Sequence, residues 1–392
     1  MSKAYAGLVV VDLTTTIAGP HCTRLLADLG ADVVKIEAPE GDMMRSRPPL
    51  RGGASSYFGE LNAGKRSVVL DLKDARAAAA VRRLAAGADI LVENFRPGVM
   101  RRLGLDYPAL AEANPRLVYC SISGYGQTGP SAELPAYAPV IHATSGYDLA
   151  HLAHQGGRTR PDNCGLYIAD VLAGTYAFAA IGAALHQRNA TGRGQHLDVS
   201  MLESMMSLAL TELQAAQFAM PPPPKRPIFG PVATADGYIS MAVASERTFR
   251  GMAAAAGRED WIADPRFARY LDRRANWAEL MEELEAWSRR LSSAECLAAL
   301  DRHAVPAAAY RTVREAMADP QLAHRGALAE VRDAGGAFKA LNPPFRMSGS
   351  ATAVGPRVAA LGEHTREVLA AAGLSEAEIA ALAVPPHDGS PA

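Results

Sequence analysis

The stretch Gly7-Leu-Val-Val-Val-Asp-Leu13 is a continuous apolar run with the length of a buried strand, and it begins the pattern that decides the fold. A helical segment follows from Cys22 to Leu29 and stops at Gly30, a residue type common at helix ends. Asp32-Val-Val-Lys-Ile-Glu37 then has the pattern of a second strand. Two strands joined through a helix are usually parallel neighbours with a right-handed crossover. The chain is therefore expected to begin with an α/β unit.

The same alternation continues as far as residue 123. Further strands are predicted at 67–71, 89–93 and 116–123, and helices at 74–86 and 107–113, whereas a polar loop rich in Gly, Pro and Arg reaches about residue 58. We expect a Rossmann-like, doubly wound parallel sheet with helices on both faces. Such sheets bind ligands beyond the carboxyl ends of their strands, so the loops there are the first candidates for a site.

The remainder of the chain predicts further domains, because 392 residues are too many for one ordinary core. Pro221 to Pro224 indicate a stiff linker. We expect a large domain over residues 1–220, a linker and small α+β domain over 221–326, and a C-terminal segment over 327–392 that ends in one helix at 363–372. Within the small domain, a strand is predicted at 236–243 and helices at 246–256, 274–291 and 294–303.

The composition makes several classes of partner improbable. The formal net charge is −1 and no long basic run occurs, so neither nucleic acid nor an anionic membrane is expected as a partner. The four cysteines are scattered without paired spacing, which argues against a disulfide framework and against a zinc site. No charged segment followed by an apolar segment begins the chain, so we expect a cytoplasmic protein.

Two motifs could indicate a cofactor or a metal, and neither has the required context. Gly124-Tyr-Gly126-Gln-Thr-Gly129 matches a dinucleotide-binding pattern, but Pro130 stands where the phosphate-binding helix would begin. His151 and His154 lack the carboxylate of a metalloprotease motif. We expect no tightly bound cofactor and no metal.

Asp170 is the most unusual charged residue of the chain, because it is the only formal charge between Asp162 and Arg188. The residues from Val171 to Leu185 are apolar or small, as in a buried helix. One interpretation makes Asp170 a helix N-cap without chemistry. The other makes it an anionic nucleophile or base that the start of the helix keeps ionised. Both remain open at this point.

Several short motifs occur in a characteristic order along nearly the whole chain. Together they resemble the class III CoA-transferase family, which includes formyl-CoA transferases and, as close relatives, α-methylacyl-CoA racemases. The motifs are Ala18-Gly-Pro20, Leu25 to Glu37, Asn62 with Lys65, Leu70-Asp-Leu-Lys73, Glu93-Asn-Phe-Arg-Pro-Gly98, Ser123 to Pro130, Gly192 to Ser200 and Val305-Pro-Ala307.

The resemblance implies a covalent role for Asp170. Its carboxylate would attack an acyl-CoA thioester to form a mixed anhydride, and the released CoA would then form an aspartyl-CoA thioester that an incoming carboxylic acid reopens. The substrates would be CoA esters and carboxylic acids. The resemblance also implies that the C-terminal segment packs back on the first domain, and that two chains form an interlocked homodimer.

The positions that match the family's CoA site are named by the same resemblance. A family arginine near Ala38 is missing here, and Arg45 could replace its phosphate contact. The implied CoA-binding residues are Ile17, Ala18, Arg45, Leu70, Lys73, Asn94, Phe95 and Arg102.

The choice of reaction rests on Tyr137, which stands where the racemases carry a histidine. Tyrosine is a poor base at neutral pH, so a transferase is preferred over a racemase. Tyr137 and the nearby His142 are predicted to contact the substrate. A CoA-ester racemase or isomerase and a non-catalytic CoA-ester binding protein remain alternatives. Loop arginines could contact a second carboxylate, which would favour succinate-, malate- or mesaconate-like substrates; these are Arg47, Arg158 and Arg160.

Overall fold

The computed structural model describes residues 3–155, 158–218 and 230–382, and these residues form two compact units. The larger unit comprises Met1–Leu152, Thr159–Leu210 and Gln321–Ala392, and the smaller comprises Ala153–Arg158 and Thr211–Pro320. The predicted linker at Pro221 to Pro224 lies outside the described residues, and the predicted boundaries at residues 220 and 326 stay predictions.

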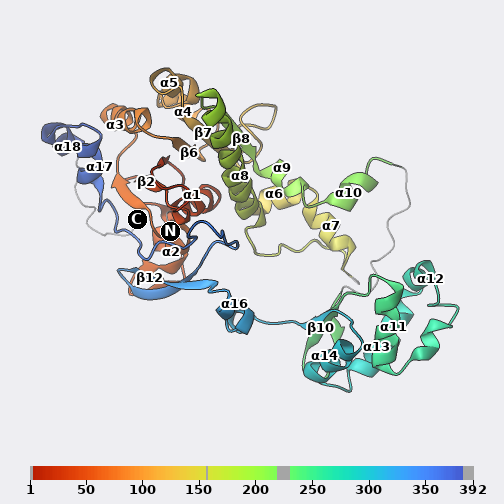
Figure 1. Ribbon diagram of the computed structural model, residues 1–392. Coiled ribbons are helices and arrows are strands. Elements are labelled where there is room, and N and C mark those ends of the chain that lie inside the picture. Colours follow the sequence, from red (N-terminus) through yellow and green to blue (C-terminus); the bar gives the residue numbers. More distant parts are fainter. Residues whose placement is uncertain (1–2, 156–157, 219–229, 383–392) are drawn as a thin grey trace. The chain divides into compact units, whose positions relative to one another are not determined.

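A six-stranded parallel sheet forms the centre of the larger unit, which confirms the predicted parallel α/β sheet (Figure 1). Its spatial order is β5-β2-β1-β6-β7-β8, the order of a doubly wound sheet. Every neighbouring pair is parallel. The strands are β1 (Val9–Asp12), β2 (Asp32–Glu37), β5 (Arg66–Val69), β6 (Ile90–Glu93), β7 (Val118–Ser123) and β8 (His196–Ser200).

Helices cover both faces of the sheet and bury two apolar cores, because side chains alternate between the two faces along each strand. The first face carries α1 (Ala18–Asp28), α6 (Ala138–Thr144), α8 (Ile168–Thr191) and α9 (Met201–Met206). The second carries α3 (Ala75–Ala86), α4 (Val99–Arg102), α5 (Tyr107–Ala113), α17 (Thr365–Ala371) and α18 (Glu376–Leu382).

The segment between β2 and β5 corrects the predicted polar loop, because it contains short elements that pack on the C-terminal part of the chain. Phe58 and Ala63, from this segment, share a small apolar core with Val331, Ala340 and Val358. The remaining elements of the larger unit are η1 (Met43–Ser46), β3 (Leu50–Arg51), β4 (Ala54–Ser55), α2 (Ser56–Asn62), α7 (Tyr147–Ala153), β12 (Leu328–Asp333) and β13 (Gly336–Leu341).

The C-terminal part also covers the outer edge of β5. The N–H of Val69 donates to Thr365 Oγ1 at 3.0 Å, and the N–H of Ser67 donates to His364 Nδ1 at 3.3 Å. Ser67 in turn accepts the N–H of His364 at 2.9 Å. The predicted single final helix is two helices, since α18 follows α17.

The smaller unit has its own core around Phe249, Trp261 and Phe267, beside a three-stranded antiparallel sheet. Its elements are α10 (Leu210–Ala215), β9 (Val232–Ala233), β10 (Tyr238–Met241), α11 (Glu246–Ala256), η2 (Glu259–Ile262), α12 (Tyr270–Ala275), α13 (Trp277–Ser288), α14 (Ser293–Arg302), β11 (Ala307–Ala309) and α15 (Val313–Met317). The next helix, α16 (Pro320–His324), belongs to the larger unit except for its first residue.

Helix α8 is long and apolar enough to cross a membrane by length and composition, with a mean hydropathy of 1.7. In this structure it packs as a core helix against α1, α9 and the sheet, burying residues such as Ala173, Ala177 and Ile181. Core helices commonly meet the same criteria, so its composition does not by itself indicate a membrane span.

Gly174 allows α8 to approach α1 very closely. A Cβ at this position would lie 2.4 Å from the carbonyl oxygen of Ala18 and 3.1 Å from the His21 ring. Ala169 and Ala173, on the same helix, are completely buried and belong to the core shared with α1. Their small size therefore serves helix packing.

We predict that Gly174→Ala lowers the free energy of unfolding by about 1–3 kcal/mol, because the added methyl group meets a backbone carbonyl. Urea unfolding measures the change. Gly182→Ala on the same helix is the matched control, since its Cβ would meet only the Tyr5 hydroxyl, at 3.3 Å, and alanine favours helix. Equal stability of the two variants would contradict the prediction.

Candidate active site

A pocket of about 180 Å³ lies at the carboxyl ends of β1 and β6. The order of the strands reverses between these two strands, and doubly wound sheets bind ligands in the crevice at this point. The loops that follow β1 and β6 meet there, since Thr15 and Asn94 are hydrogen-bonded. The residues around the pocket include Thr15, Ala18, Asn94, Phe95, Tyr137 and Asp170.

Asp170 is the third residue of α8, which begins at Ile168 with Tyr167 as its N-cap. The interpretation of Asp170 as an N-cap is therefore wrong. An acceptor for the first turn comes instead from another helix, because the N–H of Ala169 donates to His142 Nε2 at 3.2 Å. Asp170 is left free to present its half-buried carboxylate to the pocket.

The carboxylate of Asp170 is held at the starts of two helices. The backbone N–H groups of Ala18, in the first turn of α1, and of Asp170 itself act on this carboxylate and lower its pKa. Burial outweighs them and raises the pKa of Asp170 to about 6. Asp170 is therefore mainly ionised at neutral pH, and its carboxylate is more basic than an exposed one. This combination suits a nucleophile.

The structure brings part of the predicted CoA set to this pocket. Ala18, Asn94 and Phe95 line it. Ile17 is the buried N-cap residue of α1, directly before Ala18. Leu70 follows β5 and is buried in the core on the second face of the sheet.

The two predicted phosphate-binding cations have a different environment. Lys73 follows β5 and Arg102 ends α4, and both are exposed. Neither side chain forms an ion pair within the described part of the chain. Both cations are therefore available to an anionic ligand at this edge of the sheet.

Arg45 is placed apart from this set. Its guanidinium donates to both carboxylate oxygens of Glu37, at 2.7 and 2.8 Å, and stacks over the Phe58 ring. Burial of Glu37 would raise its pKa, but the hydrogen bonds from Arg45 and further charges outweigh burial and lower it. The charge of Arg45 is thus already neutralised, and it lines a separate pocket.

The two residues predicted to contact substrate are also separated. Tyr137 lines the pocket and is 66% exposed, so its ring is open to a ligand. His142 is 1% exposed, does not line the pocket, and contacts the start of α8. Burial lowers the pKa of His142, which favours the neutral ring that accepts the Ala169 N–H.

Three polar residues near Asp170 were missed by the sequence reasoning. The hydroxyls of Tyr57 and Ser123 are buried and have no hydrogen-bond partner among the described residues. Tyr57 stacks on Tyr167, and its pKa is raised by burial and by the nearby Tyr167 and Asp170. Arg96 is exposed and lines the pocket, whereas Arg47 and Arg160 do not. Tyr57 lies within the segment that was predicted to be a loop, and the structure places it in α2.

Glu93 is a second titratable group beneath the pocket, at the end of β6. It accepts the N–H of Phe95 at 2.9 Å and so shapes the loop that follows. Burial raises its pKa to about 7. Any pH dependence of this site must therefore be assigned to Asp170 or to Glu93 by a separate variant of each.

Known proteins match the chain over nearly its whole length. Residues 5–365 match CoA-transferase family III. Succinate–glutarate CoA-transferase of Agrobacterium fabrum is 34% identical over 93% of this chain and 94% of its own length. Acetyl-CoA:oxalate CoA-transferase of Acetobacter aceti is 37% identical over 86% of this chain and 88% of its own.

A solved structure agrees with these matches. The crystal structure of a CaiB/BaiF family protein from Brucella suis superposes with a TM-score of 0.83 and 32% identity, and it covers 95% of this chain and 100% of that one. The shared fold extends through both units. Together with the sheet and the pocket described above, these similarities show that the chain belongs to CoA-transferase family III and is a class III CoA-transferase.

Proposed function

We propose that Asp170 is the covalent nucleophile that moves CoA between two carboxylic acids. The observation that carries the proposal is the position of Asp170, which lines the pocket together with Ala18 at the start of α1. Carboxylates are weak nucleophiles in water, so partial desolvation and fixed orientation favour attack. The elevated pKa of Asp170 adds to the basicity of its attacking oxygen.

The proposed reaction needs no reactant besides the CoA ester and the acceptor acid. An oxygen of Asp170 attacks the thioester carbonyl, and the carbon–sulfur bond breaks. CoA leaves as a thiolate, and the acyl group remains joined to Asp170 in a mixed anhydride. The thiolate attacks the aspartyl carbonyl and releases the donor acid. The acceptor carboxylate then forms a second anhydride by displacing CoA thiolate, which attacks the acceptor's carbonyl and frees Asp170.

The tetrahedral intermediates of these steps need hydrogen-bond donors near the reacting carbonyl. Two hydroxyls are available, those of Tyr57 and Ser123, because both are buried without a partner among the described residues. Lys73 and Arg102 would bind the CoA phosphates, and the backbone of Asn94 and the ring of Phe95 would border the pantetheine arm. Tyr137 would contact the acyl group.

We further propose that one of the two acids is a dicarboxylate such as succinate, malate or mesaconate. Two relatives act, by their names, on succinate and glutarate and on oxalate. In this chain, the exposed Arg96 lines the same pocket as Asp170 and could bind the second carboxylate. A cytoplasmic location stays a prediction.

A covalent adduct tests the nucleophile directly. We expect succinyl-CoA or glutaryl-CoA, followed by hydroxylamine, to leave a hydroxamate on the peptide that contains Asp170, as mass spectrometry of the digested protein would show. Asp170→Asn should give no hydroxamate and no turnover while still binding CoA. Asp74→Asn is the matched control, since Asp74 is an N-cap on the other face of the sheet.

Two results would count against the proposal. Turnover by Asp170→Asn would exclude Asp170 as the nucleophile. Uptake of deuterium at the α-carbon of an acyl-CoA, without an acceptor acid and without an adduct, would indicate the racemase or isomerase alternative.

The pH dependence follows from the raised pKa of Asp170. Attack needs the ionised carboxylate, so kcat/KM should fall as pH drops below about 6. Because the folded-state pKa lies above the unfolded value, the stability that the side chain contributes is present at low pH and is lost as pH rises through about 6. Asp170→Asn should therefore raise the Tm more at pH 7.5 than at pH 4.5.

Steady-state rates and thermal unfolding across this pH range check both statements. Glu93→Gln is the control, because it removes the other group that titrates nearby. If the acid limb of the rate profile disappeared in Glu93→Gln, the limb would belong to Glu93 instead of Asp170.

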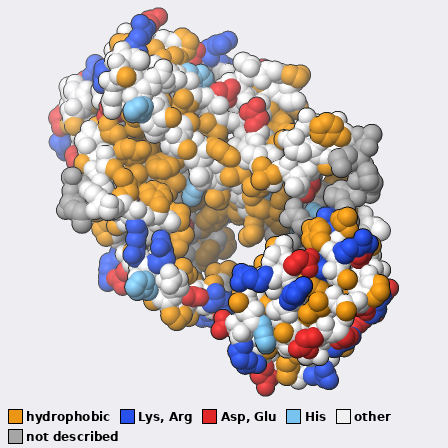
Figure 2. All heavy atoms as spheres, turned by 45° about the vertical axis from the view of Figure 1, so that its right-hand side comes forward, with side chains coloured by type: hydrophobic (Ala, Val, Ile, Leu, Met, Phe, Trp, Pro, Cys, Tyr) orange, Lys and Arg blue, Asp and Glu red, His pale blue; other side chains and the backbone are white. Residues whose placement is uncertain are grey.

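We propose that the active form is a homodimer, as the resemblance implies. Helix α8 leaves an apolar face uncovered within the larger unit, where Val171 and Tyr176 are each 44% exposed. Leu208, in the turn after α9, is 45% exposed. Figure 2 shows hydrophobic side chains gathered on one face of the larger unit. A second copy of the chain would bury such a surface.

Light scattering should give twice the chain mass of 41.4 kDa for the wild-type protein. Tyr176→Glu should shift the protein toward the monomer, because it places a charge on the apolar face. Ala79→Glu on the exposed side of α3 should not. A wild-type monomer at micromolar concentration would contradict the dimer.

A further inference from the structure

The side chain of Asn94 joins the two loops that form the pocket. Its Oδ1 accepts the backbone N–H of Thr15 at 2.9 Å, and its Nδ2 donates to the carbonyl oxygen of the same residue at 2.8 Å. Both polar atoms of the amide are thus used by the backbone of the β1–α1 loop. A side chain engaged in this way is committed to holding the loop.

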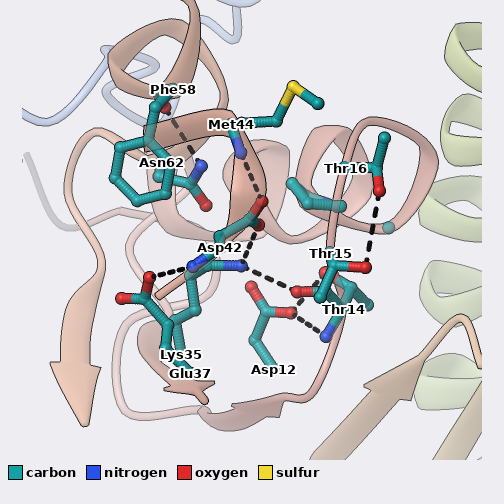
Figure 3. A network of polar contacts seen from close by, with 12 residues as sticks. Asp12, Thr14, Thr15, Thr16, Lys35, Glu37, Asp42, Met44, Phe58 and Asn62 are labelled. Atoms are coloured by element: carbon teal, nitrogen blue, oxygen red, sulfur yellow. Dashed lines mark hydrogen bonds and ion pairs between the residues drawn. The ribbon is translucent and has the colours of Figure 1, made fainter. Parts of the chain in front are cut away.

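The other side of the same loop is held from within the protein (Figure 3). The N–H and the hydroxyl of Thr14 both donate to Asp12 Oδ1, at 2.9 and 2.5 Å. The buried ammonium of Lys35 donates to the carbonyl oxygen of Thr14 at 2.7 Å. Thr14 and Thr15 are therefore fixed on opposite sides, the first by buried charges and the second by Asn94.

The residue that follows is held in an unfavourable conformation. Thr16 has a φ of 71°, in the left-handed region that β-branched residues rarely adopt. Such a conformation persists only where the surrounding contacts impose it, and it is frequent at functional sites. Two residues later, Ala18 lines the same pocket as Asp170, and its backbone N–H lowers the pKa of that carboxyl group.

We propose that Asn94 is a positioning residue for Asp170, which it orients through the Thr15 backbone, the Thr16 conformation and the Ala18 N–H. This inference rests on the proposed role of Asp170 as the nucleophile. Without the amide of Asn94, Thr16 can relax to a negative φ, and the direction of the Ala18 N–H then changes.

The test is the single-turnover rate of adduct formation at Asp170 in Asn94→Ala, measured by hydroxylamine trapping. We expect the rate to fall about 10- to 100-fold, the scale of a misplacement of about 1 Å. The KM for the acyl-CoA donor should change little. The acid limb of the rate profile should move to higher pH, because the Ala18 hydrogen bond lowers the pKa of the carboxyl group.

Asn114→Ala is the matched control. Asn114 also uses its amide for backbone contacts, donating to the carbonyl oxygens of Ala85 and Ala88 at 3.0 and 2.7 Å. It lies at the amino-terminal edge of the sheet, opposite the pocket, since it ends α5 four residues before β7 begins. We expect Asn114→Ala to lower the Tm without changing the trapping rate or the pH profile.

A double-mutant cycle examines the strain itself. Glycine adopts a positive φ without penalty, so in Thr16→Gly the loop conformation should depend less on the hydrogen bonds from Asn94 to Thr15. The fall in rate caused by Asn94→Ala should then be at least fivefold smaller in the Thr16→Gly background. An unchanged fall in both backgrounds would overturn the proposed route through Thr16.

The remaining outcomes separate this inference from the proposed function. If the wild-type protein forms no adduct at Asp170, the proposed function fails, and this inference fails with it. If the wild-type adduct forms and Asn94→Ala forms it equally fast, only the inference is overturned. A raised KM for the donor with an unchanged trapping rate would make Asn94 a direct CoA contact and would also overturn it.

Discussion

The close contact between α1 and α8 is the constraint on which the site depends. Gly174 allows the backbone of one helix to touch the other, and the backbone N–H of Ala18 consequently acts on the carboxylate of Asp170, one turn before Gly174. Two helix starts thus converge on one anion, each contributing a favourable dipole. Burial raises the pKa of the same carboxyl group. The fold therefore makes Asp170 basic while keeping it ionised at neutral pH.

Beneath this contact lies a cluster of buried charges that ties the sheet to the surrounding loops. The ammonium of Lys65 contacts Asp12 Oδ2, Thr23 Oγ1 and Asn62 Oδ1 at 2.7 to 3.0 Å. Burial lowers the pKa of Lys65 to about 8. Burial would raise the pKa of Asp12, but Lys65 and Lys35 lower it to about 2. Removing one member of such a cluster costs about 3–5 kcal/mol, so its residues maintain one arrangement of the loops.

Much of the central sheet could be predicted because β1 lies in a largely apolar run, and β2 and β7 are segments of strand length that contain β-branched residues. The edge strand β8 was missed, since His196 and Asp198 are exposed and interrupt its apolar pattern. The elements at 43–62 were also missed, because their packing partners lie near residues 331–358 and local sequence contains no signal of them.

The same distinction applies to the site residues. Those with a local sequence signal could be predicted, and those that depend on distant contacts could not. The isolated charge of Asp170 and the loops at Ala18 and Asn94 could be identified from the sequence. The start of α8 could not, because its acceptor is His142, which lies 27 positions earlier. Nor could the engagement of Arg45 with Glu37, or the position of Tyr57 against Tyr167, since each depends on tertiary packing.

The covering of β5 by the C-terminal part has a consequence for how the chain is made. The groups that pair with the outer edge of β5, on His364 and Thr365, lie nearly 300 positions later in the sequence. During synthesis from the N-terminus, β5 emerges long before its cover, and its free backbone groups can pair with another strand in the meantime. A chain shortened before residue 364 would keep this edge open permanently. Aggregation of such a fragment would then reflect the missing cover and would say nothing about the catalytic residues.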